Sequence, residues 1–329
     1  MPAQTNAPLP EGLEIAGYRI VKKIASGGFS FVYLAYDEDG NAVAIKEYLP
    51  GALTVRKSGD LAPIIATENL AIYRIGLKCF FEEGRALARI VHPHVVSVVN
   101  FFRANETVYM VMGYESGRSL QDFLLRPRDD PTKPLISERF MRKMFSQVMD
   151  GLREVHTHKL LHLDLKPANI YLRLDGTPLL LDFGAARQAF KSDITKIYPM
   201  YTPGFAAPEL LVRNGNLGPW TDIYGLGAAM YACLAGMPPQ SIEHRKTDDR
   251  LAANLAKFEG VYTPELLDLI RWSLRLDPLE RPQSVFALQK ALRDTSPVET
   301  VVEPGAWTRL RAWLNRPANR SAQLPGQTK

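Results

Sequence analysis

The sequence predicts an α+β protein with two lobes, a β-rich N-terminal lobe followed by a mainly helical C-terminal lobe. Strand-like runs of apolar residues follow one another from Tyr18 to about residue 114. Apolar residues at helical spacing dominate from Leu120 onward. The length of 329 residues suffices for two such units. We expect an N-lobe at 15–113, a C-lobe at 114–295 and a tail at 296–329.

The N-lobe is predicted from five strands and one helix. Residues 1–14 are rich in proline and polar residues, and we expect them to be disordered. The runs at 18–24, 31–36 and 42–48 predict three antiparallel strands joined by tight turns. Two further strand-like runs lie at 95–102 and 107–114.

Helical spacing at 80–91, with Phe80, Leu87 and Val91 on one face, predicts a helix. The 47–79 segment before it is too long for a structureless connection within a compact lobe. We expect this segment to have structure or function of its own, and its place beside the helix indicates control of that helix.

Composition excludes several classes of protein. The two cysteines, Cys79 and Cys233, cannot form a disulfide framework, which favours a reducing compartment. The first residues resemble no signal peptide, and no run reaches the roughly 18 apolar residues that span a bilayer. We therefore expect a cytoplasmic protein. The net charge of +5 is mild, and five basic against two acidic residues in 296–329 supply most of it, which argues against nucleic-acid binding.

One segment carries a strong chemical signal. His162, Asp164 and Asn169 form the pattern HxDxxxxN, and Asp182-Phe183-Gly184 follows after a short hairpin. Phosphoryl transfer needs a positioned hydroxyl, Mg²⁺ and neutralised phosphate charge. An aspartate for the hydroxyl proton, with an asparagine and a second aspartate for metal, would meet these needs.

With these motifs, residues 18–292 closely resemble the protein-kinase superfamily, particularly its bacterial serine/threonine members of the Hanks type. The resemblance implies the bilobal kinase fold with ATP and Mg²⁺ as ligands. It makes Asp164 the catalytic base, places Lys166 near the γ-phosphate, and assigns Asn169 and Asp182 to Mg²⁺.

The resemblance also assigns Lys46, in the run VAIK, to the α- and β-phosphates, held in place by a helix glutamate. Glu82 and Glu83 are both candidates. In kinases the pairing glutamate precedes the proline of the HPN-like motif by ten residues, and Pro93 selects Glu83.

The nucleotide site is less regular. The family's glycine-rich pattern falls on Ala25, Gly27, Ser30 and Val32, so one of its three glycines survives, with Gly28 beside it. The resemblance assigns six positions to the adenine pocket: Val32 and Ala44 as roof, Met112 as gatekeeper, the backbone of Gly113 and Glu115 at the base edge, and Tyr171 as floor.

The remaining motifs concern support and regulation. By resemblance, Thr202 positions the substrate hydroxyl, Glu209 pairs with Arg281, and Asp222 anchors the catalytic loop. Leu163 stands where most loop-phosphorylated kinases carry an arginine that binds the loop phosphate. We therefore expect activity without phosphorylation of the activation segment at Ser192 or Thr195.

Outside the kinase motifs, His156 and His158 end a predicted helix, where we expect solvated or capping roles. Residues 304–316 of the tail predict a short basic amphipathic helix. Contact of this helix with a membrane surface or a partner, and packing on the helical lobe, are open alternatives.

The sequence favours a serine/threonine protein kinase that acts on protein substrates of unknown identity. The alternative is a pseudokinase scaffold that binds nucleotide or a partner without turnover. Scaffolds commonly lose at least one member of the catalytic set, and this chain has them all. A small-molecule kinase is disfavoured, because such enzymes generally lack the set of Thr202, Glu209, Asp222 and Arg281.

Overall fold

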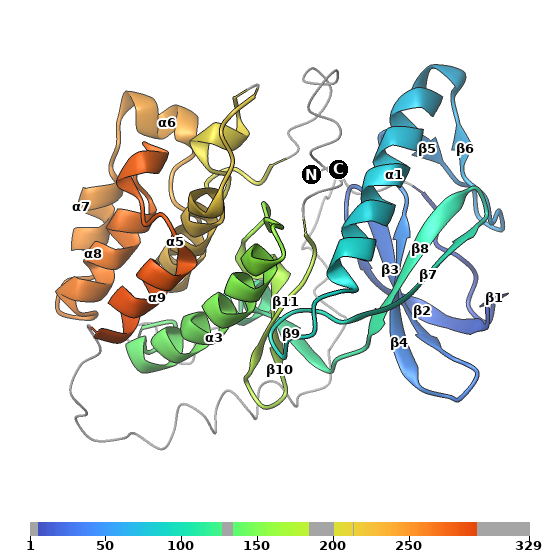
Figure 1. The fold of residues 1–329 in the computed structure, drawn as a ribbon, viewed down its shortest axis with the longest axis horizontal. Helices are drawn as coiled ribbons and strands as arrows, with labels where there is room; N and C mark the ends of the chain where they lie inside the picture. Colours follow the sequence, from blue (N-terminus) through green and yellow to red (C-terminus); the bar gives the residue numbers. More distant parts are fainter. Residues whose placement is uncertain (1–5, 127–133, 184–200, 213, 295–329) are drawn as a thin grey trace, which may run out of the picture.

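The computed structural model describes residues 6–126, 134–183, 201–212 and 214–294. Gly184, Ser192, Thr195 and the predicted helix at 304–316 lie outside these ranges. Figure 1 shows two lobes, with the large sheet and α1 on one side and a cluster of helices on the other. This arrangement confirms the predicted fold class.

A six-stranded antiparallel sheet forms the N-lobe, in the order β1-β2-β3-β4-β8-β7. The strands are β1 (Glu14–Ile15), β2 (Tyr18–Ser26), β3 (Ser30–Tyr36), β4 (Ala42–Tyr48), β7 (Val98–Ala104) and β8 (Thr107–Gly113). The five predicted strands are confirmed as β2, β3, β4, β7 and β8. The predicted boundary after Gly113 falls between β8 and β9, which belong to different sheets.

Alternation along the central strand β4 gives the sheet two different buried faces. Ala44 and Tyr48 belong to the core that the sheet shares with α1 and the C-lobe, and we call this side the inner face. Val43 and Ile45 belong to a separate apolar cluster, on what we call the outer face. Nearly all of β4 is therefore buried, as expected for a central strand covered on both sides.

The helix α1 (Leu70–Leu87) covers the inner face and contacts β7 and β8. The predicted bounds of 80–91 are therefore wrong at both ends. Tyr73 and Leu77 extend the buried stripe of Phe80 by two turns toward the N-terminus. At the other end Val91 lies beyond the helix and is almost fully exposed.

The prediction of disorder for residues 1–14 is wrong for residues 6–14. Leu9 is buried in the outer-face cluster, and its amide donates to the hydroxyl of Tyr33 at 3.2 Å. Asn6 is also buried and donates to Thr54 Oγ1 at 3.0 Å. The polar, proline-rich composition hid a few well-placed anchors that fix this segment on the sheet.

The segment at 47–79 has the internal structure that its length predicted. It includes the end of β4, a hairpin of β5 (Thr54–Val55) and β6 (Ile64–Ile65), the 3₁₀ turn η1 (Thr67–Asn69) and half of α1. Figure 1 shows the hairpin beside the N-terminal end of α1. The segment thus connects β4 to α1.

The C-lobe combines a small sheet with helices. The sheet order is β11-β10-β9, formed by β9 (Gly117–Ser119), β10 (Ile170–Arg173) and β11 (Pro178–Leu180). The helices are α2 (Leu120–Leu124), α3 (Glu138–Thr157), α5 (Pro219–Ala235), α6 (Ile242–Thr247), α7 (Leu251–Ala256), α8 (Pro264–Ser273) and α9 (Val285–Asp294). Short 3₁₀ turns are η2 (Pro167–Asn169), η4 (Pro208–Leu210) and η5 (Pro278–Glu280).

Two helices organise this lobe. α5 is apolar on all sides and buried along nearly its whole length, so it forms the centre. α3 is amphipathic, and Ser137 caps its first turn by accepting from the Phe140 amide at 3.4 Å. In the part of the chain that the structure describes, none of the helices combines the length and apolar character needed to cross a bilayer.

Candidate active site

The first turn of α5 anchors the loop that carries His162 and Asp164. The buried carboxylate of Asp222 accepts the backbone amides of His162 at 2.9 Å and Leu163 at 2.7 Å. Leu163 has a φ of +62°, a left-handed conformation that costs energy in a residue other than glycine. The two hydrogen bonds stabilise this turn, which confirms Asp222 as the anchor of the loop.

Asp164 occupies the centre of the site. Lys166 Nζ lies 3.0 Å from Asp164 Oδ2 and 3.1 Å from Thr202 Oγ1. Asn169 Nδ2 donates at 2.8 Å to both the carbonyl and the Oδ2 atom of Asp164. The structure therefore brings together the predicted base, its lysine, the asparagine and the threonine.

The second acidic residue of the site meets the strand lysine. Lys46 Nζ lies 3.0 Å from Asp182 Oδ1, and the Asp182 side chain is 43% exposed. Asp182 adopts a left-handed φ of +55°, a strained conformation of the kind often found at functional sites. This ion pair joins the sheet of the N-lobe to the end of the C-lobe hairpin.

Glu83 lies buried on α1, one turn after Phe80. The ring centre of Phe80 lies 5.4 Å from Lys46 Nζ, so the helix borders the lysine. The pairing of Lys46 with Glu83 stays a prediction.

Asn169 and Asp182 have the chemistry of a magnesium site. Mg²⁺ prefers hard oxygen ligands from one or two side chains together with substrate phosphates. Asn169 Nδ2 lies 3.4 Å from the carbonyl oxygen of Asp182, so the two residues share one site. Because the amide nitrogen of Asn169 is directed at Asp164, its oxygen is the atom left for a metal.

The phosphate-loop residues form the tip of the β2–β3 hairpin. Ala25 faces Val32 across the hairpin, and Gly27 donates to the Ser30 carbonyl at 2.8 Å. Val32 in turn pairs with Lys46 on β4, so the loop begins beside this lysine. The structure thus places Ala25, Gly27, Gly28 and Val32 where the sequence predicted a phosphate loop.

The residues predicted for the adenine pocket come from both lobes. Ala44 and Met112 are register partners on β4 and β8, and both are buried on the inner face. The Gly113 amide donates to the Ser97 carbonyl at 3.1 Å. Tyr171 donates to the Glu115 carbonyl at 3.2 Å, which ties β10 to the segment between the lobes. Burial raises the pKa of Tyr171 to about 12, so it stays protonated.

The support predicted from Glu209 and Arg281 is present, and a second one involves His162. Arg281 forms a bidentate ion pair with Glu209, at 2.7 and 3.0 Å, and both residues are buried. The ring of His162 stacks on Phe183 with centres 4.4 Å apart. Burial lowers the pKa of His162, so this ring is neutral at pH 7.

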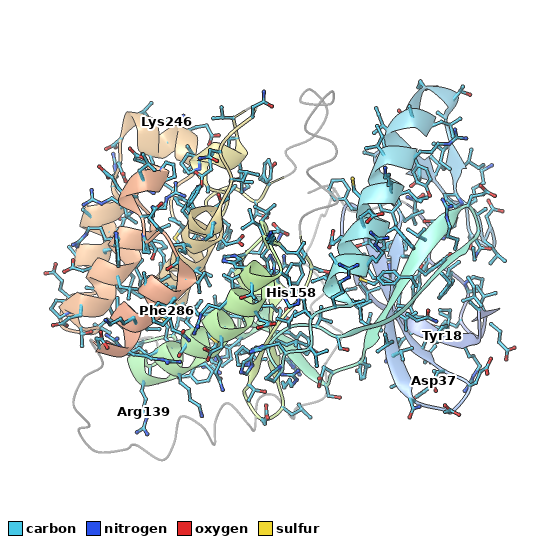
Figure 2. All side chains as sticks on the ribbon, viewed as in Figure 1. Tyr18, Asp37, Arg139, His158, Lys246 and Phe286 are labelled. Carbon is cyan, nitrogen blue, oxygen red and sulfur yellow. The ribbon has the colours of Figure 1, made fainter. Side chains whose placement is uncertain are left out.

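Sequence reasoning missed one member of the site and assigned another correctly. His156 Nε2 lies 2.8 Å from Asp222 Oδ2, so its predicted solvated or capping role is wrong. His158 follows the last residue of α3 and lies 3.0 Å from the Glu154 carbonyl through Nδ1, as a capping residue does. Figure 2 labels His158 at this end of the helix. The sequence signal for His156 was its position two residues before His158 on the predicted helix. At that spacing the two side chains face different sides of the helix, and His158 faces solvent.

Sequence reasoning also missed a polar cluster on the outer face. Glu47 follows the apolar alternation of Val43 and Ile45, so a charge falls on an apolar face. Such a position requires a buried partner, which the structure supplies as Arg56 from the 47–79 segment.

Comparison with known proteins agrees with this geometry. The profile of the protein kinase domain family matches residues 18–293. The serine/threonine-protein kinase PknL of Mycobacterium tuberculosis (strain ATCC 25618 / H37Rv) is 28% identical over 98% of this chain and 75% of that protein. A probable serine/threonine-protein kinase KIN1 homolog of Enterocytozoon bieneusi is 29% identical over 80% of this chain, which spans 40% of that relative.

Two solved structures are similar in fold. The structure described as PpkA-294 apo form has a TM-score of 0.76 and 33% identity, and the match covers 87% of this chain and 99% of that one. The PknI kinase domain of Mycobacterium tuberculosis has a TM-score of 0.60 and 21% identity, over 88% of this chain and 100% of that one.

Proposed function

This chain belongs to the protein kinase domain family, and we propose that it is a Hanks-type bacterial kinase that transfers the γ-phosphoryl of Mg·ATP to serine and threonine hydroxyls of proteins. One observation carries the proposal. Asp164, Lys166 and Thr202 form a chain of contacts of 3.0 and 3.1 Å, with Asn169 bonded to the same aspartate. This is a preformed site for one hydroxyl and the phosphoryl group that it attacks.

The residues divide the work. Asp164 accepts the proton of the attacking hydroxyl, and Thr202 fixes the approach of that hydroxyl. The positive charge of Lys166 stabilises the negative charge that develops on the γ-phosphoryl oxygens. Mg²⁺ bound by Asn169 and Asp182 would neutralise phosphate charge. Asp164 and Thr202 stand in place before the reaction, so the hydroxyl-binding part of the site needs little reorganisation.

Lys46 changes partner during the cycle. The α- and β-phosphates would replace the half-exposed Asp182 carboxylate as its partner, and Asp182 would then be available to hold Mg²⁺. Glu83, buried on α1, is the side chain that we expect to hold Lys46 in this second position.

Adenine recognition uses the backbone between the lobes. The amide of Gly113 is engaged by Ser97, so its carbonyl oxygen is the group to accept from the adenine amino group. The amide of Glu115 would donate to the ring. Val32, Ala44 and Met112 supply apolar contacts above the base and behind it, and Tyr171 lies below.

The acceptor assignment rests on Lys166 and Thr202. Their contact places a lysine two residues after the base and a threonine of the TPGFAAPE segment at the same point. That combination resembles serine/threonine kinases rather than small-molecule kinases. The relatives PknL and the KIN1 homolog carry the same designation in their names.

The test is transfer of label from γ-³²P ATP to the chain itself and to generic basic proteins, followed by phosphoamino acid analysis. We expect label on serine and threonine that disappears on chelation of Mg²⁺ and in Lys46→Ala and Asp182→Asn. If the wild type binds ATP but transfers no label to any acceptor, the pseudokinase scaffold is the better account.

Activity without phosphorylation of the activation segment is a separate part of the proposal. Leu163 is buried in the apolar core, so its side chain neither carries charge nor reaches a phosphate. We expect the double substitution Ser192→Ala and Thr195→Ala to keep turnover within about threefold on a peptide substrate, less than one hydrogen bond is worth. A fall to background would show that phosphorylation is required.

Location and partners form a further part of the proposal. Cys79 and Cys233 are free thiols, which fits the reducing cytoplasm. We propose that residues 304–316 bring the chain to an anionic membrane surface. Co-sedimentation with anionic liposomes, with and without residues 304–329, tests this, and equal pelleting would remove the membrane contact.

A further inference from the structure

Backbone hydrogen bonds to the residues after β4 hold the phosphate loop. The Leu49 amide donates to the Phe29 carbonyl at 2.8 Å, and the Gly51 amide donates to the Gly28 carbonyl at 2.9 Å. These bonds continue the β3–β4 pairing beyond the last register pair, Ser30 and Tyr48. The tip of the loop is therefore held by the residues that follow β4.

Residues 49–56 are folded around one carbonyl group. The Pro50 carbonyl accepts the amides of Leu53 and Thr54 at 2.9 and 3.1 Å, and the Thr54 hydroxyl at 2.8 Å. Gly51 stands second in the turn that Leu53 closes. The position of Gly51 beside the phosphate loop thus depends on where Thr54 and the residues after it are fixed.

Arg56 fixes this segment on the outer face of the sheet. Its guanidinium forms a bidentate ion pair with Glu47, at 2.5 and 2.8 Å, and both side chains are fully buried. Arg56 Nη2 also donates to the Tyr33 hydroxyl at 3.1 Å. Glu47 Oε2 accepts from Tyr33 at 2.7 Å, and Oε1 accepts from Tyr109 at 3.0 Å.

The backbone of Arg56 binds the N-terminal segment at the same place. Its amide donates to Asn6 Oδ1 at 2.5 Å, and its carbonyl accepts from the Ala7 amide at 2.9 Å. Arg56 Nε donates to the Ala7 carbonyl at 2.8 Å. Asn6 also donates to Thr54, and the Thr54 hydroxyl donates to the Pro50 carbonyl. These hydrogen bonds connect the N-terminal segment to Pro50.

We propose that Arg56 is a positioning residue for nucleotide binding, which acts by holding residues 49–56 so that Leu49 and Gly51 fix the phosphate loop. We call these contacts of residues 49–56 the brace. Because the loop has only one of the three usual glycines, its shape depends on the brace and not on its own sequence alone. The inference rests on the proposed function only in that the loop binds ATP phosphates.

Amide hydrogen exchange on the full chain without nucleotide tests the brace directly. We expect Leu49 and Gly51 to be protected in the wild type and to exchange about tenfold faster in Arg56→Met, because backbone hydrogen bonds open more often in a segment that is no longer held on the sheet. Unchanged protection of both amides in Arg56→Met would overturn the proposal. Should Arg56→Met not fold, Arg56→Lys keeps the charge but loses the bidentate bond, and the same exchange is read in that variant.

A backbone variant tests the effect on nucleotide binding. Gly51→Pro removes the amide that bonds Gly28, at the second position of a turn, where proline is favoured. Gly51→Ala keeps this amide and is the matched control. We expect Gly51→Pro to raise the dissociation constant of a fluorescent ATP analogue and the KM for ATP about three- to tenfold, as for one lost hydrogen bond.

The KM for a peptide substrate should stay within twofold in both Gly51 variants, and Gly51→Ala should bind ATP like the wild type. Equal ATP affinity in Gly51→Pro and Gly51→Ala would overturn the proposal. Nucleotide affinity and amide exchange are measured without phosphoryl transfer, so a chain that proves catalytically inactive still gives a decisive result.

Discussion

The two faces of β4 carry neighbouring charged residues, Lys46 and Glu47, whose ion pairs differ in their exposure to water. Lys46 points to the inner face, where its partner Asp182 is 43% exposed. Glu47 points to the outer face, where its partner Arg56 is completely buried and shares in a set of hydrogen bonds. Two ion pairs one residue apart therefore stand in very different environments.

This difference separates chemistry from support. An ion pair that water reaches contributes little to stability and can exchange its partner for a phosphate. A buried pair contributes through geometry, and its loss leaves an uncompensated charge in an apolar surrounding. Substitutions on the inner face should thus change turnover, and those on the outer face should change folding.

The largest effect should come from the outer face. Arg56→Met leaves the buried Glu47 carboxylate without its bidentate partner, and we expect the free energy of unfolding to fall by about 3–5 kcal/mol. Urea unfolding measures this. The double variant Glu47→Leu with Arg56→Met removes both charges and should recover most of the loss. A double variant no more stable than Arg56→Met would show that the charge left behind is not the cause.

The inner face should give the opposite result. Lys46→Met removes the cation that we propose binds the phosphates, and we expect kcat/KM to fall by about 10²–10³, as when one electrostatic contact to developing charge is removed. Stability should change by less than about 1 kcal/mol, because the partner is exposed. Lys22→Met, on the exposed side of β2, is the matched control and should retain activity. A loss of stability as large as that of Arg56→Met would remove the distinction between the faces.

The inner face was also the more predictable of the two. Asp164, Asn169, Asp182 and Lys46 lie in short motifs whose spacing identifies their chemistry, and the structure brings them together. The brace on the outer face joins Asn6, Glu47 and Arg56, which share no motif and meet only through the fold. The composition of residues 6–14 predicted disorder for the same reason, because composition carries no information on long-range contacts.

A smaller effect should follow from the buried histidine of the catalytic loop. Because burial lowers the pKa of His162 in the folded state, the unfolded chain binds a proton first as the pH falls below about 6.5. The free energy of unfolding should therefore decline as the pH falls below this value, and His162 contributes at most about 1.4 kcal/mol per pH unit to the decline. His162→Phe should lose less stability than the wild type between pH 7.5 and 5.5 in urea unfolding.

His158→Gln provides the matched control, because His158 is exposed at the end of α3. It should follow the wild-type pH dependence. If His162→Phe also follows the wild type, protonation of His162 does not contribute to acid sensitivity.

The smallest effect concerns the segment between the lobes. Tyr171→Phe removes the hydroxyl bonded to the Glu115 carbonyl and keeps the ring below the adenine. We expect the KM for ATP to rise about two- to fivefold with kcat unchanged, in line with one neutral hydrogen bond. Steady-state kinetics with varied ATP measures this, and a large fall in kcat would mean that Tyr171 acts in more than binding.

The most direct test of the account is single-turnover transfer from γ-³²P ATP with excess enzyme, comparing the wild type with Asp164→Asn. Nucleotide affinity is measured in parallel for both. We predict equal affinity, label on serine and threonine in the wild type, and transfer slower by about 10²–10⁴ in the variant, the share of general base catalysis. Equal transfer rates, or bound ATP without transfer by the wild type, would contradict the account.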